Sequence, residues 1–139
     1  MKVFLYFIGK PRDQPANALV AEYLKRTSRY APCESREVKP NAFDFLDRHA
    51  SAYKIFLDPA GKQMDSPRFA TLLGKLEDEG REVVFLLGGH DGLTEQHRQR
   101  ADLLLSLSTM TWPHELARAM LAEQIYRAFA TLRGHPYAR

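Results

Sequence analysis

The last third of the chain constrains the fold most, because a glycine turn, an apolar run and a long apolar helix follow one another there. The turn is LLGGHDGL at 86–93, the run is DLLLSLSTMTWPHE at 102–115, and the helix ends in RGHPYAR. This order places two loops rich in accessible main chain side by side, at the ends of two buried strands. Small ligands bind at such strand ends in α/β proteins, so we expect a ligand site there.

Apolar strand-like runs alternate with amphipathic segments along the whole chain. This alternation predicts an α/β fold with a mostly parallel sheet and helices on both faces. No repeat or linker interrupts it, so residues 1–139 are expected to form one domain. Strands are expected at 2–8, 33–39, 53–57, 82–87 and 103–108, with a turn at 58–62. Helices are expected at 14–29, 41–48, 66–80, 94–101 and 113–132, with Asp13 and Thr94 as caps.

Composition narrows the class of protein. The chain has 139 residues, 45% of them hydrophobic, which suits one core but is short for an enzyme holding both a cofactor and a large substrate. We therefore expect an oligomer. It has no apolar run of about 18 residues and no small-residue cleavage site after its first strand, which predicts a cytoplasmic protein without a membrane span. Cys33 is the one cysteine, and the histidines lack metal-ligand spacing, so no metal site is expected.

Charge permits a nucleic-acid partner without requiring one. The formal net charge is +3, and basic residues gather at the two ends of the chain whereas acidic residues cluster at 77–79. An ordinary solvated surface is the simpler explanation of this distribution.

The final helix is apolar on more than one side. Leucine, isoleucine, alanine, methionine and phenylalanine side chains cover more than a single stripe between Leu116 and Leu132. A helix that is apolar on two sides is buried on two sides. One side is expected to meet the sheet, and the other a second copy of the chain. The alternative is that the helix at 14–29 covers it.

Two segments are candidate walls of the ligand site. Gly88, Gly89 and Gly92 follow a buried strand and permit main chain to approach a ligand closely, although many strand–helix turns need glycine for its own sake. They do not form a dinucleotide fingerprint, which would follow the first strand. The stretch 107–112, LSTMTW, offers main-chain hydrogen bonds and an apolar slot that suits an adenine ring, but its hydroxyls also fit turn and cap positions.

Polar residues on and after the final helix are the remaining candidates. His114 lies in its first turn, where a partly exposed histidine bonded to main chain is the simpler interpretation. Glu123 and Arg127 stand four residues apart, so an intrahelical pair is expected, although an arginine on an apolar helix also suits a ligand. His135 and Tyr137 lie in the tail, where a tyrosine ring is able to stack on a base.

Three segments of the last third carry a longer pattern. They are GGHDGL at 88–93, LSLSTMTWPHELARAM at 105–120 and AEQIYRAFATLRGHPY at 122–137. Together they resemble the ribosomal RNA large subunit methyltransferase H family of the SPOUT superfamily of trefoil-knotted methyltransferases. The resemblance continues more loosely through FIGKPRD at 7–13 and LDPAGKQMDS at 57–66, and so spans essentially the whole chain.

The resemblance implies a minimal SPOUT domain with a C-terminal trefoil knot, acting as a homodimer with S-adenosyl-L-methionine. The implied reaction is methylation of N3 of a pseudouridine in large-subunit (23S) ribosomal RNA on assembled ribosomes. By position, Arg127 and Tyr137 match tail-side residues that handle the substrate, and His135 is a further candidate in catalysis. The implied cofactor contacts are Leu57, Gly88, Leu107, Ser108, Thr109, Met110, Thr111 and Trp112.

Two departures from the family keep other interpretations open. Ala138 stands where the family usually has a histidine, and the segment 40–52 is shorter than usual. The alternatives are a SPOUT methyltransferase with another RNA target and a ribosome-binding factor without turnover. A flavodoxin-like nucleotide binder is disfavoured, because no phosphate loop follows the first strand.

Overall fold

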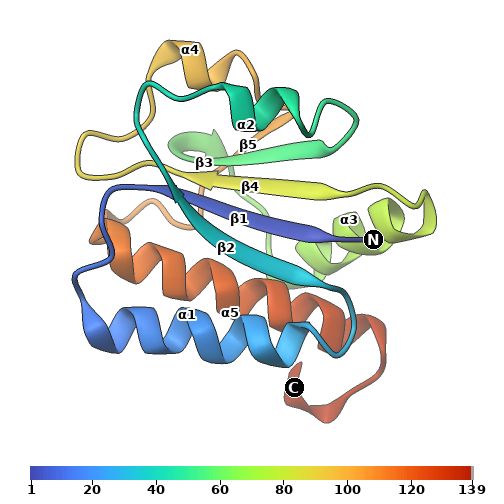
Figure 1. The fold of residues 1–139 in the computed structure, drawn as a ribbon. Coiled ribbons are helices and arrows are strands. Elements are labelled where there is room, and N and C mark those ends of the chain that lie inside the picture. Colours follow the sequence, from blue (N-terminus) through green and yellow to red (C-terminus); the bar gives the residue numbers. More distant parts are fainter. Residues whose placement is uncertain (139) are drawn as a thin grey trace.

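The computed structural model, which describes residues 1–138, is built on a parallel five-stranded sheet with strand order β2-β1-β4-β3-β5 (Figure 1). All paired strands run in the same direction. The strands are β1 (Val3–Ile8), β2 (Cys33–Val38), β3 (Tyr53–Lys62), β4 (Val83–Leu87) and β5 (Leu103–Leu105). The predicted α/β class with a parallel sheet is confirmed.

Helices cover both faces of the sheet, as predicted. One face carries α1, α3 and α5, and the other carries the short helices α2 and α4 (Figure 1). The helices are α1 (Gln14–Thr27), α2 (Asp44–Asp47), α3 (Ser66–Asp78), α4 (Glu95–Arg98) and α5 (His114–Leu132), and a 3-10 turn spans Pro136–Ala138. Among the described residues, no helix is long and apolar enough to cross a bilayer.

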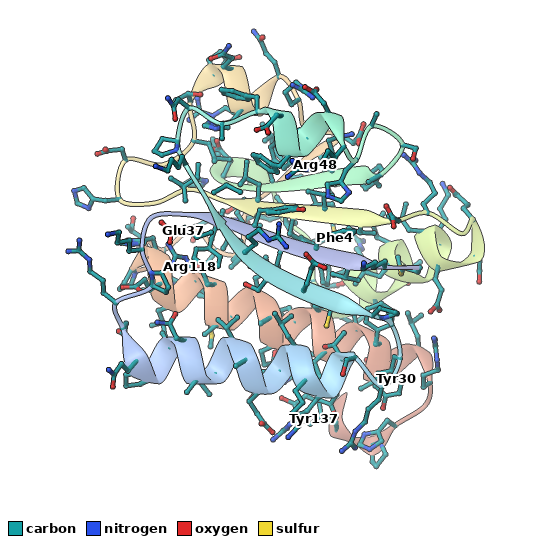
Figure 2. The ribbon with its side chains drawn as sticks, in the orientation of Figure 1. Phe4, Tyr30, Glu37, Arg48, Arg118 and Tyr137 are labelled. Carbon is teal, nitrogen blue, oxygen red and sulfur yellow. The ribbon has the colours of Figure 1, made fainter. Side chains whose placement is uncertain are left out.

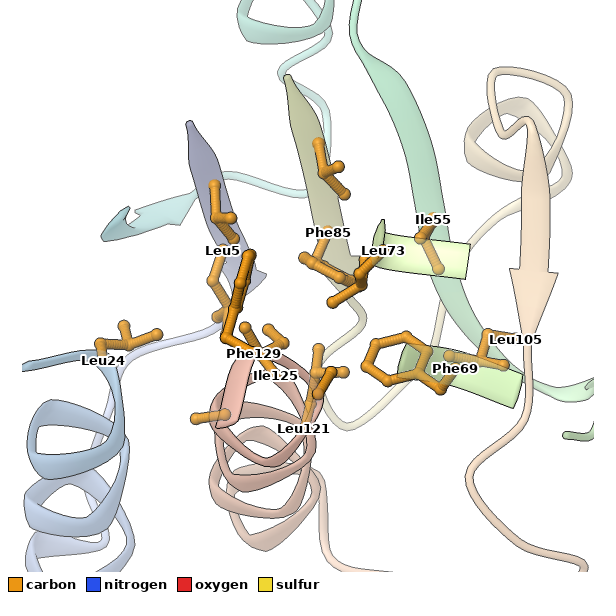
Figure 3. Packing of buried hydrophobic residues seen from close by; sticks show 14 of the residues in the cluster. Leu5, Leu24, Ile55, Phe69, Leu73, Phe85, Leu105, Leu121, Ile125 and Phe129 are labelled. Carbon is orange, nitrogen blue, oxygen red and sulfur yellow. The ribbon is translucent and has the colours of Figure 1, made fainter. Parts of the chain in front are cut away.

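The larger core lies between the sheet and the three long helices. Alternate residues of β1 point to opposite faces, so Leu5 enters this core whereas Phe4 and Tyr6 enter the smaller one beneath α2. Figure 3 shows Phe129 and Ile125 of α5 against the strands, in a layer formed by residues from both ends of the sequence. Because every central strand is buried on both faces, continuous apolar runs such as VVFLL are what the fold requires.

Helix α5 is buried on more than one side without a second subunit. It packs against α1 and α3 as well as the sheet, and Ala119, Leu121, Ala122 and Ile125 are fully buried. The alternative that the first helix covers its second apolar side is therefore the correct one for this feature, with α3 contributing. The two-sided burial of α5 gives no argument for a dimer, and the homodimer stays a prediction. The trefoil knot likewise stays a prediction.

Element boundaries differ from expectation mainly where tertiary pairing decides them. The segment 58–62 was predicted to be a turn, but β3 continues through it because Lys62 pairs with Leu105 after a register shift. Strand β5 ends at Leu105 rather than 108, which leaves more of the following stretch as loop. Asp13 and Thr94 cap their helices as predicted, whereas Asp65 rather than Ser66 caps α3.

The two ends of α5 lie on opposite sides of the molecule. Its first turn lies beside the loops that follow β1 and β4, and its last turn leads to the chain end near the end of α1 (Figure 1). Candidate residues at the start of α5, such as His114, therefore lie far from those at its end, such as Arg127.

Candidate functional site

A pocket of about 450 Å³ lies at the carboxyl ends of β4 and β5, beside residues 57–59 of β3. These strands are neighbours in the sheet, so their loops converge at one edge. Every residue for which a cofactor contact was implied lines this pocket, and it is bordered further by the start of α5. The lining residues of that set are Leu57, Gly88, Leu107, Ser108, Thr109, Met110, Thr111 and Trp112.

The glycine turn brings main chain unusually close to main chain. A Cβ on Gly88 would lie 2.6 Å from the carbonyl carbon of Gly92, a distance that no packed side chain tolerates. Gly92 has φ +73°, and its N–H donates to the Gly89 carbonyl at 3.0 Å. Glycine is therefore required here by the turn itself, and Gly88, Gly89 and Gly92 all line the pocket.

The loop 106–112 combines turn chemistry with an open apolar rim. Ser106 Oγ donates to the Ser108 carbonyl at 2.9 Å, and the Met110 N–H donates to Ser108 Oγ at 3.0 Å. The hydroxyls thus serve the turn, while the loop also forms a pocket wall. Met110 and Trp112, which line the pocket, are 75% and 36% exposed. Large apolar side chains left this open suit a surface that a ligand or another molecule covers.

An ion pair fixes the end of β3 beside the pocket. The buried Asp58 accepts from Arg98 Nε of α4 and, at 2.8 Å, from the N–H of Ala60. Burial raises the pKa of the Asp58 carboxyl, but the hydrogen bonds from Arg98 and Ala60 outweigh it, so the pKa lies below its ordinary value. The charged carboxylate ties the pocket floor to α4.

A second polar cluster holds the β1–α1 loop against the start of α5. Glu115 Oε1 accepts from the N–H groups of Arg12 and Asp13 at 2.6 and 3.0 Å. Arg118, 1% exposed, donates from Nη2 to the Ile8 carbonyl at 2.9 Å. Burial lowers its pKa. Figure 2 places Arg118 at the pocket end of α5, far from Tyr137 at the other end.

The three candidate catalytic residues, Arg127, His135 and Tyr137, do not line the pocket. Arg127 is roughly three and a half turns beyond His114 on α5, or about 20 Å at the usual rise per residue. The expected intrahelical pair is present, since Arg127 Nη2 donates to Glu123 Oε2 at 2.7 Å. Tyr137 Oη donates to the same oxygen at 2.8 Å, and His135 is exposed beside it.

Of the remaining candidates, the structure places the histidines but does not describe the side chain of Ala138. His114 is half-buried and lines the pocket, as does the exposed His90. In residues 1–138 there is no group of three His, Cys, Asp or Glu side chains able to hold a metal ion. The side chain of Ala138, on which the departure from the family rests, lies outside the described part of the chain.

Three residues that organise the site were absent from the sequence prediction. Asp58 follows a strand and Glu115 follows a helix-starting proline, which are common positions for carboxylates. Arg118 carried the stronger signal, because an arginine between alanines on a helix apolar all round needs a buried partner. Its partners are the carbonyls of Ile8 and Gly9, which no side-chain pattern reveals, and Glu115, whose i,i+3 spacing was the available signal.

Comparison with known proteins identifies the family. A family described as "Predicted SPOUT methyltransferase" matches residues 1–138. A ribosomal RNA large subunit methyltransferase H from Solibacter usitatus is 63% identical, with both chains covered in full. Another, from Rhodospirillum centenum, is 40% identical over 100% of this chain and 99% of its own. This chain belongs to the ribosomal RNA large subunit methyltransferase H family. The resemblance in its sequence motifs is thereby confirmed.

Solved structures agree on the fold. A probable methylase family protein from Haemophilus influenzae has a TM-score of 0.63 at 11% identity, covering 99% of this chain and 70% of its own. A SpoU methyltransferase from Streptomyces viridochromogenes, solved in complex with AdoMet, has a TM-score of 0.56 at 15% identity, covering 94% and 61%. The minimal SPOUT fold of this member of the large subunit methyltransferase H family is therefore shared with distant methyltransferases.

The lowered pKa of Asp58 predicts a pH-dependent stability contribution. In the folded state the carboxylate binds its proton more weakly than in the unfolded state, so its contribution is present above about pH 4 and is lost on acidification. Asp58→Asn should lower the free energy of unfolding at pH 7 by about 1 kcal/mol, allowing for screening at the part-exposed Arg98. The deficit should shrink below about pH 4, as measured by urea denaturation across pH.

Asp78→Asn is the matched control, because Asp78 is exposed at the end of α3. A deficit for Asp58→Asn that persists unchanged at low pH would contradict the role of its charge.

Proposed function

We propose that this protein methylates N3 of a pseudouridine in large-subunit ribosomal RNA, using S-adenosyl-L-methionine and acting as a homodimer on the assembled ribosome. The observation that carries the proposal is the pocket, whose walls come from residues 57–59 of β3 and from the loops after β4 and β5. Membership of a methyltransferase family supports the reaction type, and the names of the full-length relatives support the RNA. The neighbour solved with AdoMet supports the cofactor.

The residues of the pocket fit this cofactor. A volume of about 450 Å³ lies within the range of small-molecule sites, and Leu57, Leu107 and Trp112 supply an apolar slot for adenine. The turn at Gly88, which a Cβ would fill, leaves main-chain donors and acceptors for the polar parts of the molecule. When bound, S-adenosyl-L-methionine supplies a methyl group attached to a sulfonium sulfur. After methyl transfer this sulfur is left as a neutral thioether.

The reaction also needs groups that manage the proton of N3. That nitrogen is acidic only well above neutral pH, so a nearby cation must stabilise the developing anion and a base must accept the proton. Arg127 carries the cation in this proposal. His135 or a water takes the proton, and Tyr137 stacks against the base. The rest of the catalytic effect comes from holding N3 and the methyl carbon at near-attack distance, about 3–3.5 Å.

Distance makes a second subunit necessary for this chemistry. Arg127 lies about 20 Å along α5 from the pocket of its own chain. In our proposal the tail of one subunit completes the pocket of the other. The exposed apolar side chains of Met110 and Trp112 at the pocket, and of Leu116 at the start of α5, give the second copy a surface to cover. The modest charge of +3 suits recognition of an assembled particle by shape as well as by phosphate contacts.

Labelled S-adenosyl-L-methionine and ribosomes from a strain lacking the enzyme test the reaction. We expect label in the large-subunit RNA of assembled ribosomes, mapping to N3 of one pseudouridine, and little label in free subunits. Arg127→Ala should lose at least about 100-fold in turnover because the anion loses its cation, while cofactor binding stays intact. Label at another nucleotide would favour a SPOUT enzyme with a different target.

Gly88→Ala tests the cofactor pocket directly. The added Cβ meets the Gly92 main chain at 2.6 Å, so the turn must move and the affinity for S-adenosyl-L-methionine should fall by at least about 10-fold in calorimetry. Gly80→Ala is the control, since Gly80 has φ +67° but lies at the end of α3, away from the pocket. It should cost about 1 kcal/mol in stability and leave affinity unchanged. Equal losses of affinity in both variants would refute the pocket assignment.

A further inference from the structure

Glu123 joins the two polar tail candidates, Arg127 and Tyr137, in one cluster. Its Oε1 accepts from Arg127 Nε at 3.2 Å, and its Oε2 accepts from Arg127 Nη2 at 2.7 Å. The same Oε2 accepts from Tyr137 Oη at 2.8 Å. One carboxylate thus binds a guanidinium side-on and a phenol end-on.

This arrangement differs from an ordinary surface pair on a helix. Glu22 and Arg26 on α1 form such a pair, with both side chains well exposed and no bond to the tail. By contrast, the side chain of Glu123 is only 13% exposed and that of Arg127 30%. The contact with Tyr137 also reaches beyond the helix, to a residue in the 3-10 turn after it. A pair that served helix stability alone would need no tail residue.

Aromatic packing leaves the Tyr137 hydroxyl aimed at Glu123. The ring of Tyr137 meets Tyr126 edge-on, with centroids 4.7 Å apart, and the Arg127 guanidinium lies 5.3 Å from the Tyr137 ring centre. The tail is therefore held by a ring contact, a cation over the ring and a hydrogen bond to the carboxylate. The edge-on contact and the cation restrict rotation of the ring about its long axis, and the hydrogen bond to Glu123 fixes the position of the hydroxyl.

The pKa shifts of Glu123, Arg127 and Tyr137 favour the protonation states that these hydrogen bonds require. Burial raises the pKa of Glu123, but hydrogen bonds from Arg127 and Tyr137 outweigh it and lower the pKa. The hydrogen bond to Glu123 raises the pKa of Arg127. Burial, Tyr23 and Glu123 all raise the pKa of Tyr137. Near neutral pH the cluster thus holds a carboxylate, a guanidinium cation and a neutral phenol.

We infer that Glu123 is a positioning residue for methyl transfer, which sets the orientation of Arg127 and Tyr137 toward the base without touching the substrate itself. The inference rests on the proposed function, in which this tail completes the partner's pocket. A carboxylate suits the task because both neighbours donate. An amide in its place offers one acceptor oxygen and turns its own N–H groups toward a donor.

Glu123→Gln and Glu123→Asp test the inference, with Glu22→Gln as the matched pair on α1. Glu123→Gln should lower kcat on ribosomes by about 10-fold to 100-fold, because the side chains of Arg127 and Tyr137 lose their orientation toward the base. KM and cofactor affinity should change less than about 2-fold. Glu123→Asp keeps the charge on a shorter arm and should recover part of the loss. Glu22→Gln should keep wild-type kcat.

A spectroscopic readout separates positioning from a general loss of structure. In protein with 13C-labelled tyrosine, the Tyr137 resonance, assigned with Tyr137→Phe, should titrate at lower pH in Glu123→Gln than in the wild type. Glu22→Gln should not move it. An unchanged Tyr137 titration, an unchanged kcat, or a parallel fall in kcat, cofactor affinity and melting temperature would each overturn the inference.

The two proposals fail in different ways. Wild-type protein that transfers no label to ribosomes would overturn the proposed function and this role together. Active wild-type protein with a fully active Glu123→Gln variant would overturn only the role of Glu123.

Discussion

The parallel pairing of β3 with β4 on one side and β5 on the other is the constraint on which the site depends. Because these strands are parallel neighbours, residues 57–59 of β3 and the loops after Leu87 and Leu105 meet at one edge of the sheet. The pairing of β3 with β5 shifts register between Leu57 and Lys62, so the part of β3 that lines the pocket lies at this irregularity. Glycine at position 88 then lets two stretches of main chain share space that a side chain would occupy.

The periodicity of the sequence was sufficient for the elements and the sheet, because continuous apolar runs occur only where both faces of a strand are buried. It was wrong about 58–62, where DPAGK has turn composition but tertiary pairing keeps the chain extended. The final helix was correctly seen as buried on two sides. Its cover by α1 and α3 depends on how the helices pack, and no single-chain pattern distinguishes that from a second subunit.

In the candidate site, too, local sequence patterns were predicted, whereas contacts between distant segments were not. The eight residues to which the sequence motifs assigned cofactor contacts all line the pocket, and all of them except Leu57 lie in the loops after β4 and β5. The polar supports at Asp58 and Arg118 escaped prediction, since their partners, Arg98 and the Ile8 carbonyl, are distant in sequence. The expected Glu123–Arg127 pair is present, and the structure adds Tyr137 to it. A tail that folds back onto the helix preceding it is invisible to an i,i+4 rule.

The pocket and the tail together define the central claim, which is that one subunit binds the methyl donor and the other presents Arg127. Mixed dimers of differently tagged Gly88→Ala and Arg127→Ala chains test it most directly. At a cofactor concentration well below the dissociation constant of the Gly88→Ala site, each homodimer should retain at most about a tenth of wild-type activity, whereas the mixed dimer joins one intact pocket to one intact tail and should recover about half. A mixed dimer as inactive as its parents, or a fully active monomer, would contradict the account.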